Sequence, residues 1–194
     1  MPDLHKRLAD ALSRPGSASS DFDLNDDFHT PDIRLTPAGV LVAVQADTER
    51  LILTKRSPRL QHHPGQIAFA GGKQDPTDAT IVDAALREAE EEIGLPRSMV
   101  NVVGTLPSHQ TVTGFAVTPV LAIVTGPFNP VPEAGEVSEV FEVPLRHVTN
   151  PAMFRIEGRH WQGRRRLYYT VPYGPYYIWG ATARILRAIA ERMS

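Results

Sequence analysis

The sequence lacks cysteine, has no long apolar run and carries no excess of positive charge. Because none of its 194 residues is cysteine, disulfides, thiolate metal ligands and a cysteine nucleophile are excluded. No apolar run approaches the roughly 18 residues that a membrane-spanning helix needs. The first residues also lack the apolar core of a signal peptide. We therefore expect a cytoplasmic protein with no membrane association.

Charge is nearly balanced, with 20 basic and 22 acidic side chains and a formal net charge of −2. Proteins that bind the nucleic-acid backbone usually carry a basic surface, so we expect no nucleic-acid partner. A local site must then bind any phosphate. An apolar content of 42% over this length suits one domain of ordinary size.

The N-terminal region differs in texture from the rest of the chain. Leucines at helical spacing predict a short amphipathic helix over residues 3–13. The Ser- and Asp-rich stretch from Ser17 to Asp27 then predicts a flexible linker. We therefore expect an N-terminal helix and linker over residues 1–32 and a main domain over residues 33–194.

The main domain has the pattern of an α/β fold with a mixed sheet. A helix is predicted over residues 79–93, with Asp78 as its N-cap and Gly94 after its end, and a second over residues 178–193. The predicted strands are 39–45 and 51–54 as a hairpin, 66–70, 101–106, 115–124, 138–142 and 166–171. Because strands and helices do not alternate regularly, a mixed sheet is favoured over a doubly wound parallel one.

One turn of the predicted central helix gathers several carboxylates. At about 100° per residue, Glu88, Glu91 and Glu92 fall within an arc of about 100°, whereas Glu90 points away. Arg87 can pair with Glu91 at a spacing of four residues. The three like charges repel one another, and a divalent cation would reverse that repulsion. Mg²⁺ prefers oxygen ligands of this kind, so this face is a candidate metal site, with a solvated acidic face as the alternative.

The segment from Gly72 to Leu95 resembles the Nudix box. That motif consists of a Gly, an acidic residue and then Arg-Glu-apolar-x-Glu-Glu-x-Gly-apolar. Residues 87–95 match every position of its second half. The first half departs from the pattern in two ways. Asp78 stands where the family usually has Glu, and the spacing from Gly72 to Arg87 is one residue longer than in the commonest form. The resemblance implies a mixed β-sheet sandwiched between α-helices, with the box, approximately residues 72–95, forming a loop, helix and loop.

The resemblance also implies residue roles. Glu88, Glu91 and Glu92 would bind Mg²⁺ or Mn²⁺, and Arg87 would orient one of these glutamates. Metal ions neutralise a diphosphate and lower the pKa of water. A carboxylate then takes the proton of the attacking water, and Glu91 and Glu136 are both candidates for this base. The alternative for Glu136 is an exposed loop carboxylate.

A second resemblance concerns the substrate. Residues 52–57 (Ile-Leu-Thr-Lys-Arg-Ser), Gly65 and residues 69–72 (Phe-Ala-Gly-Gly) are similar to the signature of the coenzyme A diphosphatase subgroup. Gln61 replaces an Arg of that signature, and Ala70 replaces a Pro. With a tail that resembles the start of the subgroup's last helix, the likeness covers roughly residues 36–190. It implies hydrolysis of coenzyme A or acyl-CoA to 4′-phosphopantetheine and adenosine 3′,5′-bisphosphate.

A coenzyme A site should hold cations beyond the metals, because this substrate carries a 3′-phosphate in addition to the diphosphate. Arg56, Lys55 and Arg59 cluster before the box, and arginine forks suit phosphate oxygens. Gly71 and Gly72 allow the backbone to approach another group closely. We interpret all five as candidate substrate-binding residues, and the alternative for Lys55 and Arg59 is a solvent-facing charge at the end of a strand.

The C-terminal part of the sequence is rich in aromatic residues. Their pattern favours packing in the core or in a homodimer, and stacking on adenine is the alternative. The aromatic residues in question are Tyr168, Tyr169, Tyr173, Tyr176, Tyr177 and Trp179. The partner we expect is a small nucleotide diphosphate. Rival functions are an ADP-ribose or nucleotide-sugar diphosphatase, a non-catalytic nucleotide sensor and an acidic interaction domain.

Overall fold

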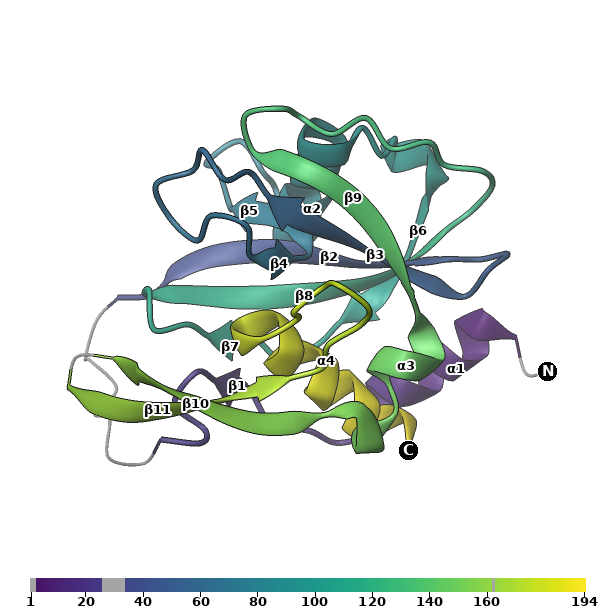
Figure 1. Ribbon diagram of the computed structural model, residues 1–194. Coiled ribbons are helices and arrows are strands. Elements are labelled where there is room, and N and C mark those ends of the chain that lie inside the picture. The colour runs from purple at the N-terminus through teal and green to yellow at the C-terminus, as the bar shows by residue number, and fades with distance from the viewer. Residues whose placement is uncertain (1–2, 26–33, 162) are drawn as a thin grey trace.

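The computed structural model describes residues 3–25, 34–161 and 163–194 (Figure 1). The helices of these residues are α1 (Leu4–Ser13), α2 (Ile81–Ile93), α3 (Leu145–Val148) and α4 (Gly180–Met193), with short 3₁₀ turns at Arg97–Met99 and Pro151–Met153. The strands are β1 (Ser19–Ser20), β2 (Thr36–Gln45), β3 (Arg50–Arg56), β4 (Ile67–Ala68), β5 (Ala70–Lys73), β6 (Val100–Thr105), β7 (His109–Gln110), β8 (Phe115–Val124), β9 (Val137–Pro144), β10 (Arg155–Trp161) and β11 (Arg164–Thr170).

The main sheet is mixed, as the sequence predicts. Within the described residues it has nine strands, and its central path runs β1-β7-β8-β2-β3-β4. Strand β2 pairs with β8 in parallel over its whole length, while β5, β6 and β9 join by antiparallel pairing. The predicted hairpin of β2 and β3 forms only at its turn, where Val44 faces Leu51. The main partner of β3 is β9, with which it pairs from Arg50 to Arg56.

Helices cover both faces of this sheet (Figure 1). Alternate side chains of β2 explain why, because successive residues of a strand point to opposite faces. Val42 and Val44 pack into the core under α1 and α4, and Leu41 and Ala43 pack into the core under α2. A strand buried on both faces reads as a continuous apolar run, which is how the sequence presents residues 39–45. The predicted Nudix-like sandwich is confirmed.

The N-terminal segment packs as part of this structure. Leu8 of α1 is fully buried in the same core as α4. Ser19 and Ser20 form β1 and pair with β7, and the side chain of Asn25 hydrogen bonds to the backbone of Leu167. The prediction of a flexible linker is therefore wrong for residues 17–25, because polar side chains there find distant hydrogen-bond partners. Residues 26 and 27 of that predicted linker lie outside the described residues.

The hairpin of β10 and β11 forms a separate two-stranded sheet beside α4 (Figure 1). The aromatic residues around it pack within the chain, as the sequence favours. Tyr176 stacks on Phe141 with ring centroids 3.6 Å apart, and Tyr168 meets Trp179 edge to face. Among the described residues, we find no helix with the length and apolar character that crossing a membrane requires.

Candidate active site

Helix α2 is held close to the sheet by its start and by a glycine of β2. Thr80 is the N-cap, and a reciprocal capping box links it to Asp83. The prediction of Asp78 as the cap is therefore wrong. The helix begins at Ile81, and the Asp78 carboxylate accepts hydrogen bonds from Arg87 instead. A Cβ added to Gly39 would lie 2.5 Å from the Ile81 carbonyl oxygen, so only glycine allows this approach. The helix ends as predicted, with Gly94 in the left-handed conformation.

Arg87 is the hub of an ionic network on α2. Its Nε and Nη2 atoms donate to the two carboxylate oxygens of Asp78 at 3.1 and 3.0 Å, a bidentate pair. Its Nη1 atom donates to Glu88 at 3.0 Å and to Glu91 at 2.9 Å. The hydrogen bonds from Arg87 lower the pKa of Asp78, whose side chain is only 6% exposed. The predicted pairing of Arg87 with Glu91 is confirmed, and the network fixes the helix against the preceding loop.

Two of the three predicted metal ligands pack against the glycine pair of β5: Glu92 is buried, and Glu88 is partly buried with 18% of its side chain exposed. The Gly71 backbone N–H donates to Glu92 at 3.1 Å, and the Glu92 residue is 6% exposed. A Cβ added to Gly72 would lie 2.4 Å from the carboxyl carbon of Glu88. Burial, together with repulsion from neighbouring carboxylates, raises the pKa of Glu92 to about 7 and also raises that of Glu88. The sequence did not indicate this burial.

The remaining acidic candidates lie at the solvent edge of this group. The Glu91 side chain is 60% exposed and tied to Arg87. Glu136 is exposed, and its charge acts on both Glu88 and Glu92, so it lies near them although 44 residues separate it from Glu92 in sequence. Glu90 is exposed, as predicted.

The chemistry of this group fits a divalent cation that keeps other ligands. Within the described ranges, no three Asp, Glu or His side chains are grouped so that they could hold a metal ion by themselves, so the predicted trio is not brought together as one site. Mg²⁺ does not require such a group, because it usually keeps waters and substrate phosphates in its shell. The buried Glu92 and the partly buried Glu88 repel each other and are compensated by Arg87, the Gly71 N–H and the charge of Arg56, so they would gain from such an ion.

A large cavity opens beside the glycine pair. Its volume is about 730 Å³, within the range of small-molecule sites, and it lies between the main sheet, the β10–β11 hairpin and the start of α4. Gly71 and Gly72 line it, and so do Arg56 and Phe69. The cavity therefore reaches the β5 backbone against which Glu88 and Glu92 of α2 pack.

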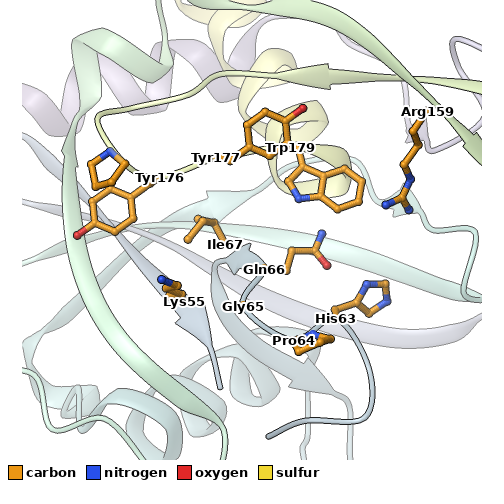
Figure 2. A pocket seen from close by; sticks show the side chains of 11 residues that line it. Lys55, His63, Pro64, Gly65, Gln66, Ile67, Arg159, Tyr176, Tyr177 and Trp179 are labelled. Atoms are coloured by element: carbon orange, nitrogen blue, oxygen red, sulfur yellow. The ribbon is translucent and has the colours of Figure 1, made fainter. Parts of the chain in front are cut away.

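The three predicted cationic residues before the box separate in space. Arg56 lines the large cavity. Lys55 instead lines a neighbouring cavity of about 450 Å³, which Tyr176 and Tyr177 also line (Figure 2). Arg59 lines neither cavity. Lys55 and Arg56 diverge where the pairing of β3 with β9 is irregular, between these two residues.

Of the residues in these surroundings, Arg159 was missed from the sequence, and the partners of Asp78, His63 and Trp179 were not predicted. Asp78 pairs with Arg87, although its role was in doubt because the family usually has Glu there. His63, Arg159 and Trp179 line both cavities and so stand where the two meet (Figure 2). Arg159 lies over the Trp179 ring at 4.4 Å from its centroid. His63 has a left-handed backbone with φ of +55°, as suits the turn that the sequence His63-Pro64-Gly65 indicates.

Comparisons with known proteins agree with this geometry. The sequence matches the NUDIX domain family over residues 35–166. A protein of Klebsiella pneumoniae subsp. pneumoniae named "Uncharacterized Nudix hydrolase NudL" is 43% identical over 154 residues, which are 79% of this chain and 80% of that protein. The protein of the same name in Cronobacter sakazakii is 42% identical over 154 residues, again 79% of this chain and 80% of that protein.

One solved structure shares the fold over nearly the whole chain. The NUDIX domain of Shewanella oneidensis NrtR, solved with ADP ribose, aligns with a TM-score of 0.52 over 90% of this chain and 97% of that one, at 14% identity. Such a low identity speaks for the fold alone. With the family match and the box residues on α2, the chain belongs to the Nudix hydrolases and is a diphosphatase of nucleoside diphosphate derivatives.

Proposed function

We propose that this enzyme hydrolyses the diphosphate of coenzyme A or an acyl-CoA to 4′-phosphopantetheine and adenosine 3′,5′-bisphosphate. The observation that carries the proposal is that residues of the subgroup signature share one cavity. Arg56, Phe69 and the glycine pair line it together, although they come from two separate strands and a connection. Gln61, which replaces a signature Arg, is exposed and lines neither cavity.

Nudix hydrolases generally use divalent ions such as Mg²⁺ or Mn²⁺, and we propose that Glu88, Glu91 and Glu92 would hold them here. A divalent ion would neutralise the diphosphate and lower the pKa of water. The packing of Glu88 and Glu92 against Gly71 and Gly72, which line the cavity, supports their assignment. Arg87 holds Glu88 and Glu91 in place through its Nη1 atom, so it positions ligands rather than touching substrate.

In the proposed reaction, the oxygen of a water molecule bonds to one phosphorus of the diphosphate and the bridging P–O bond breaks. One proton of that water passes to a carboxylate base. Glu91 and Glu136 are the candidates, because both are exposed at the edge of the carboxylate group. The missing side chain of Gly72 leaves the room that the Glu88 carboxylate occupies at this edge.

A substrate panel tests the proposal. We expect the purified protein with Mg²⁺ or Mn²⁺ to hydrolyse coenzyme A faster than ADP-ribose, NADH or diadenosine polyphosphates, with both products identified by mass spectrometry. A clear preference for ADP-ribose would disprove the choice of substrate and leave the hydrolase activity intact.

Matched variants on α2 test the metal residues. We expect Glu92→Gln to lose most of its turnover at saturating Mn²⁺, because a neutral amide cannot replace a carboxylate ligand. Glu90→Gln is the control, since Glu90 lies on the same helix and is exposed. Unchanged turnover in Glu92→Gln would remove the assignment. Comparing Glu91→Gln with Glu136→Gln across pH identifies the base. The variant that lacks the base should have an altered acidic limb in its pH–turnover profile.

A further inference from the structure

Two arginines and a histidine from three segments line the large cavity, and two of them also line the smaller one beside it. Arg56 comes from the end of β3, His63 from the following turn, and Arg159 from β10 of the separate hairpin. Figure 2 shows the His63 ring and the Arg159 guanidinium on the same side of the smaller cavity, beyond Gln66.

These side chains lie close enough for their charges to interact. The pKa of His63 is lowered by burial first, and then by the positive charges of Arg56 and Arg159. The carboxylate of Asp21 acts in the opposite direction, but it is occupied elsewhere. It accepts hydrogen bonds from the Val112 N–H at 2.9 Å and from His109 at 3.3 Å.

Within the described ranges, no carboxylate forms an ion pair with Arg56 or Arg159 at 4.0 Å or less. The buried Nε of Arg56 has no hydrogen-bond partner there. Arg159 touches the face of Trp179, a contact that leaves its N–H donors available at the ring edge. Neighbouring arginines differ, because Arg184 is paired with Asp23 at 2.7 Å. Among the described residues, the guanidinium groups of Arg56 and Arg159 therefore have no ion-paired carboxylate, although the charge of Arg56 also acts on Glu92.

We propose that Arg159, together with Arg56 and His63, forms a second anion subsite that binds a phosphomonoester of the substrate, apart from the diphosphate at the glycine pair. This inference rests on the proposed function, in which the group is the 3′-phosphate of coenzyme A. It also accounts for the replacement of a signature Arg by Gln61, since a guanidinium from the β10–β11 hairpin supplies the missing charge.

The test compares substrates that differ only in this group. Steady-state kinetics are measured with coenzyme A and with 3′-dephospho-coenzyme A. For Arg159→Ala we expect kcat/KM with coenzyme A to fall by about 10- to 100-fold, the size of a lost charge-assisted contact. The loss should appear mainly in KM, because the contact is remote from the bond that breaks. The rate with the dephosphorylated substrate should change by less than about 2-fold.

Two further variants sharpen this comparison. Arg155→Ala removes the same charge from the same strand, at an exposed position that lines neither cavity, and should leave both substrates unaffected. Arg159→Lys should recover part of the preference for coenzyme A. Equal losses with both substrates, or no loss with either, would overturn the subsite.

A binding measurement separates this inference from the proposed function. Titration calorimetry in EDTA compares adenosine 3′,5′-bisphosphate with adenosine 5′-monophosphate, so no turnover is needed. We expect the bisphosphate to bind at least about 10-fold more tightly to the wild type and equally with the monophosphate to Arg159→Ala. If coenzyme A is not hydrolysed but this preference exists, the proposed function fails and the subsite stands. Equal binding of both nucleotides to the wild type would refute the subsite.

Discussion

The raised pKa of Glu92 predicts an unusual pH dependence of stability in the metal-free enzyme. Its carboxyl titrates near 4.5 in an unfolded chain and near 7 in the folded one, chiefly because of burial. A group whose pKa rises on folding adds stability at pH values below its unfolded pKa. That stability is lost as the pH rises through the folded pKa. The free energy of unfolding should therefore decline between about pH 4.5 and pH 7.

The magnitude follows from the difference between the two titrations. Each pKa unit corresponds to 1.36 kcal/mol, so complete ionisation of Glu92 costs about 3 kcal/mol. For a protein of this size, that corresponds to a melting temperature lower by roughly 6–12 °C. Glu88 acts in the same direction, since its pKa is raised as well. Mn²⁺ should offset the loss by binding only the folded state.

Urea denaturation in EDTA at constant ionic strength, from pH 5 to pH 8, measures this effect. Glu92→Gln is the reference, because its amide oxygen can still accept the Gly71 N–H and its side chain does not ionise. The wild type should lose about 3 kcal/mol relative to this variant over the range. Glu90→Gln should follow the wild type. Identical pH profiles for the wild type and Glu92→Gln would refute the reasoning.

Three other predictions concern neighbouring features. Gly72→Ala should lower kcat at least about 10-fold at saturating Mn²⁺, because the new methyl group would take the space of the Glu88 carboxylate; thermal melting checks the fold. Leu8→Ala should cost about 2–5 kcal/mol in urea denaturation, since this side chain is fully buried, and a much smaller cost would separate α1 from the core. Burial opposes ionisation of Asp21, but its hydrogen bond with His109 prevails and lowers the pKa below 3.8. The stability advantage of the wild type over Asp21→Asn should therefore shrink as the pH falls below about 4, as acid unfolding would show.

Local periodicity was enough to predict the core of the site. Residues four apart on a helix share a face, so Arg87 and Glu91 could be paired from the sequence alone. The same rule grouped Glu88 with Glu92. Their burial could not be predicted in this way, because it depends on β5 passing directly beneath the helix. The bidentate pair of Asp78 was also missed, since the path of the loop that brings it to Arg87 is set by packing.

Residues brought in from distant segments gave no local signal. Arg159 reaches the cavity through a hairpin that follows the Nudix box by more than 60 residues, and its sequence neighbours are ordinary strand residues. Lys55 was grouped with Arg56 because they are adjacent. They separate in the structure where the pairing of β3 with β9 is irregular.

The fold shows the same division between local and distant information. Helices α1, α2 and α4 and most of the longer strands were predicted to within a few residues, because each has its own periodicity and terminal residues. Helix α3 and strands β1, β5, β7 and β10 were not predicted. The parallel pairing of β2 with β8 joins residues 36–45 to residues 115–124, and no local pattern indicates it. The N-terminal segment was misjudged as a linker because Ser19 and Asn25 look like loop residues. Both are buried. Ser19 is hydrogen bonded to His109, 90 residues away, and Asn25 to Leu167, 142 residues away.

The carboxylates of α2 give the strongest distinction between an enzyme and an acidic interaction surface. Solvated acidic side chains stabilise or destabilise a helix by a few tenths of a kcal/mol and have no reason to be buried together. Glu88 and Glu92 are held under a glycine backbone, where ionisation costs stability unless a cation is present. A metal-site carboxylate should therefore show opposite effects on substitution, with Glu92→Gln raising metal-free stability at pH 8 while removing turnover. If Glu92 instead had a purely structural role on an acidic surface, Glu92→Gln would lower the stability of the protein, and the wild type would have no hydrolase activity for the substitution to remove.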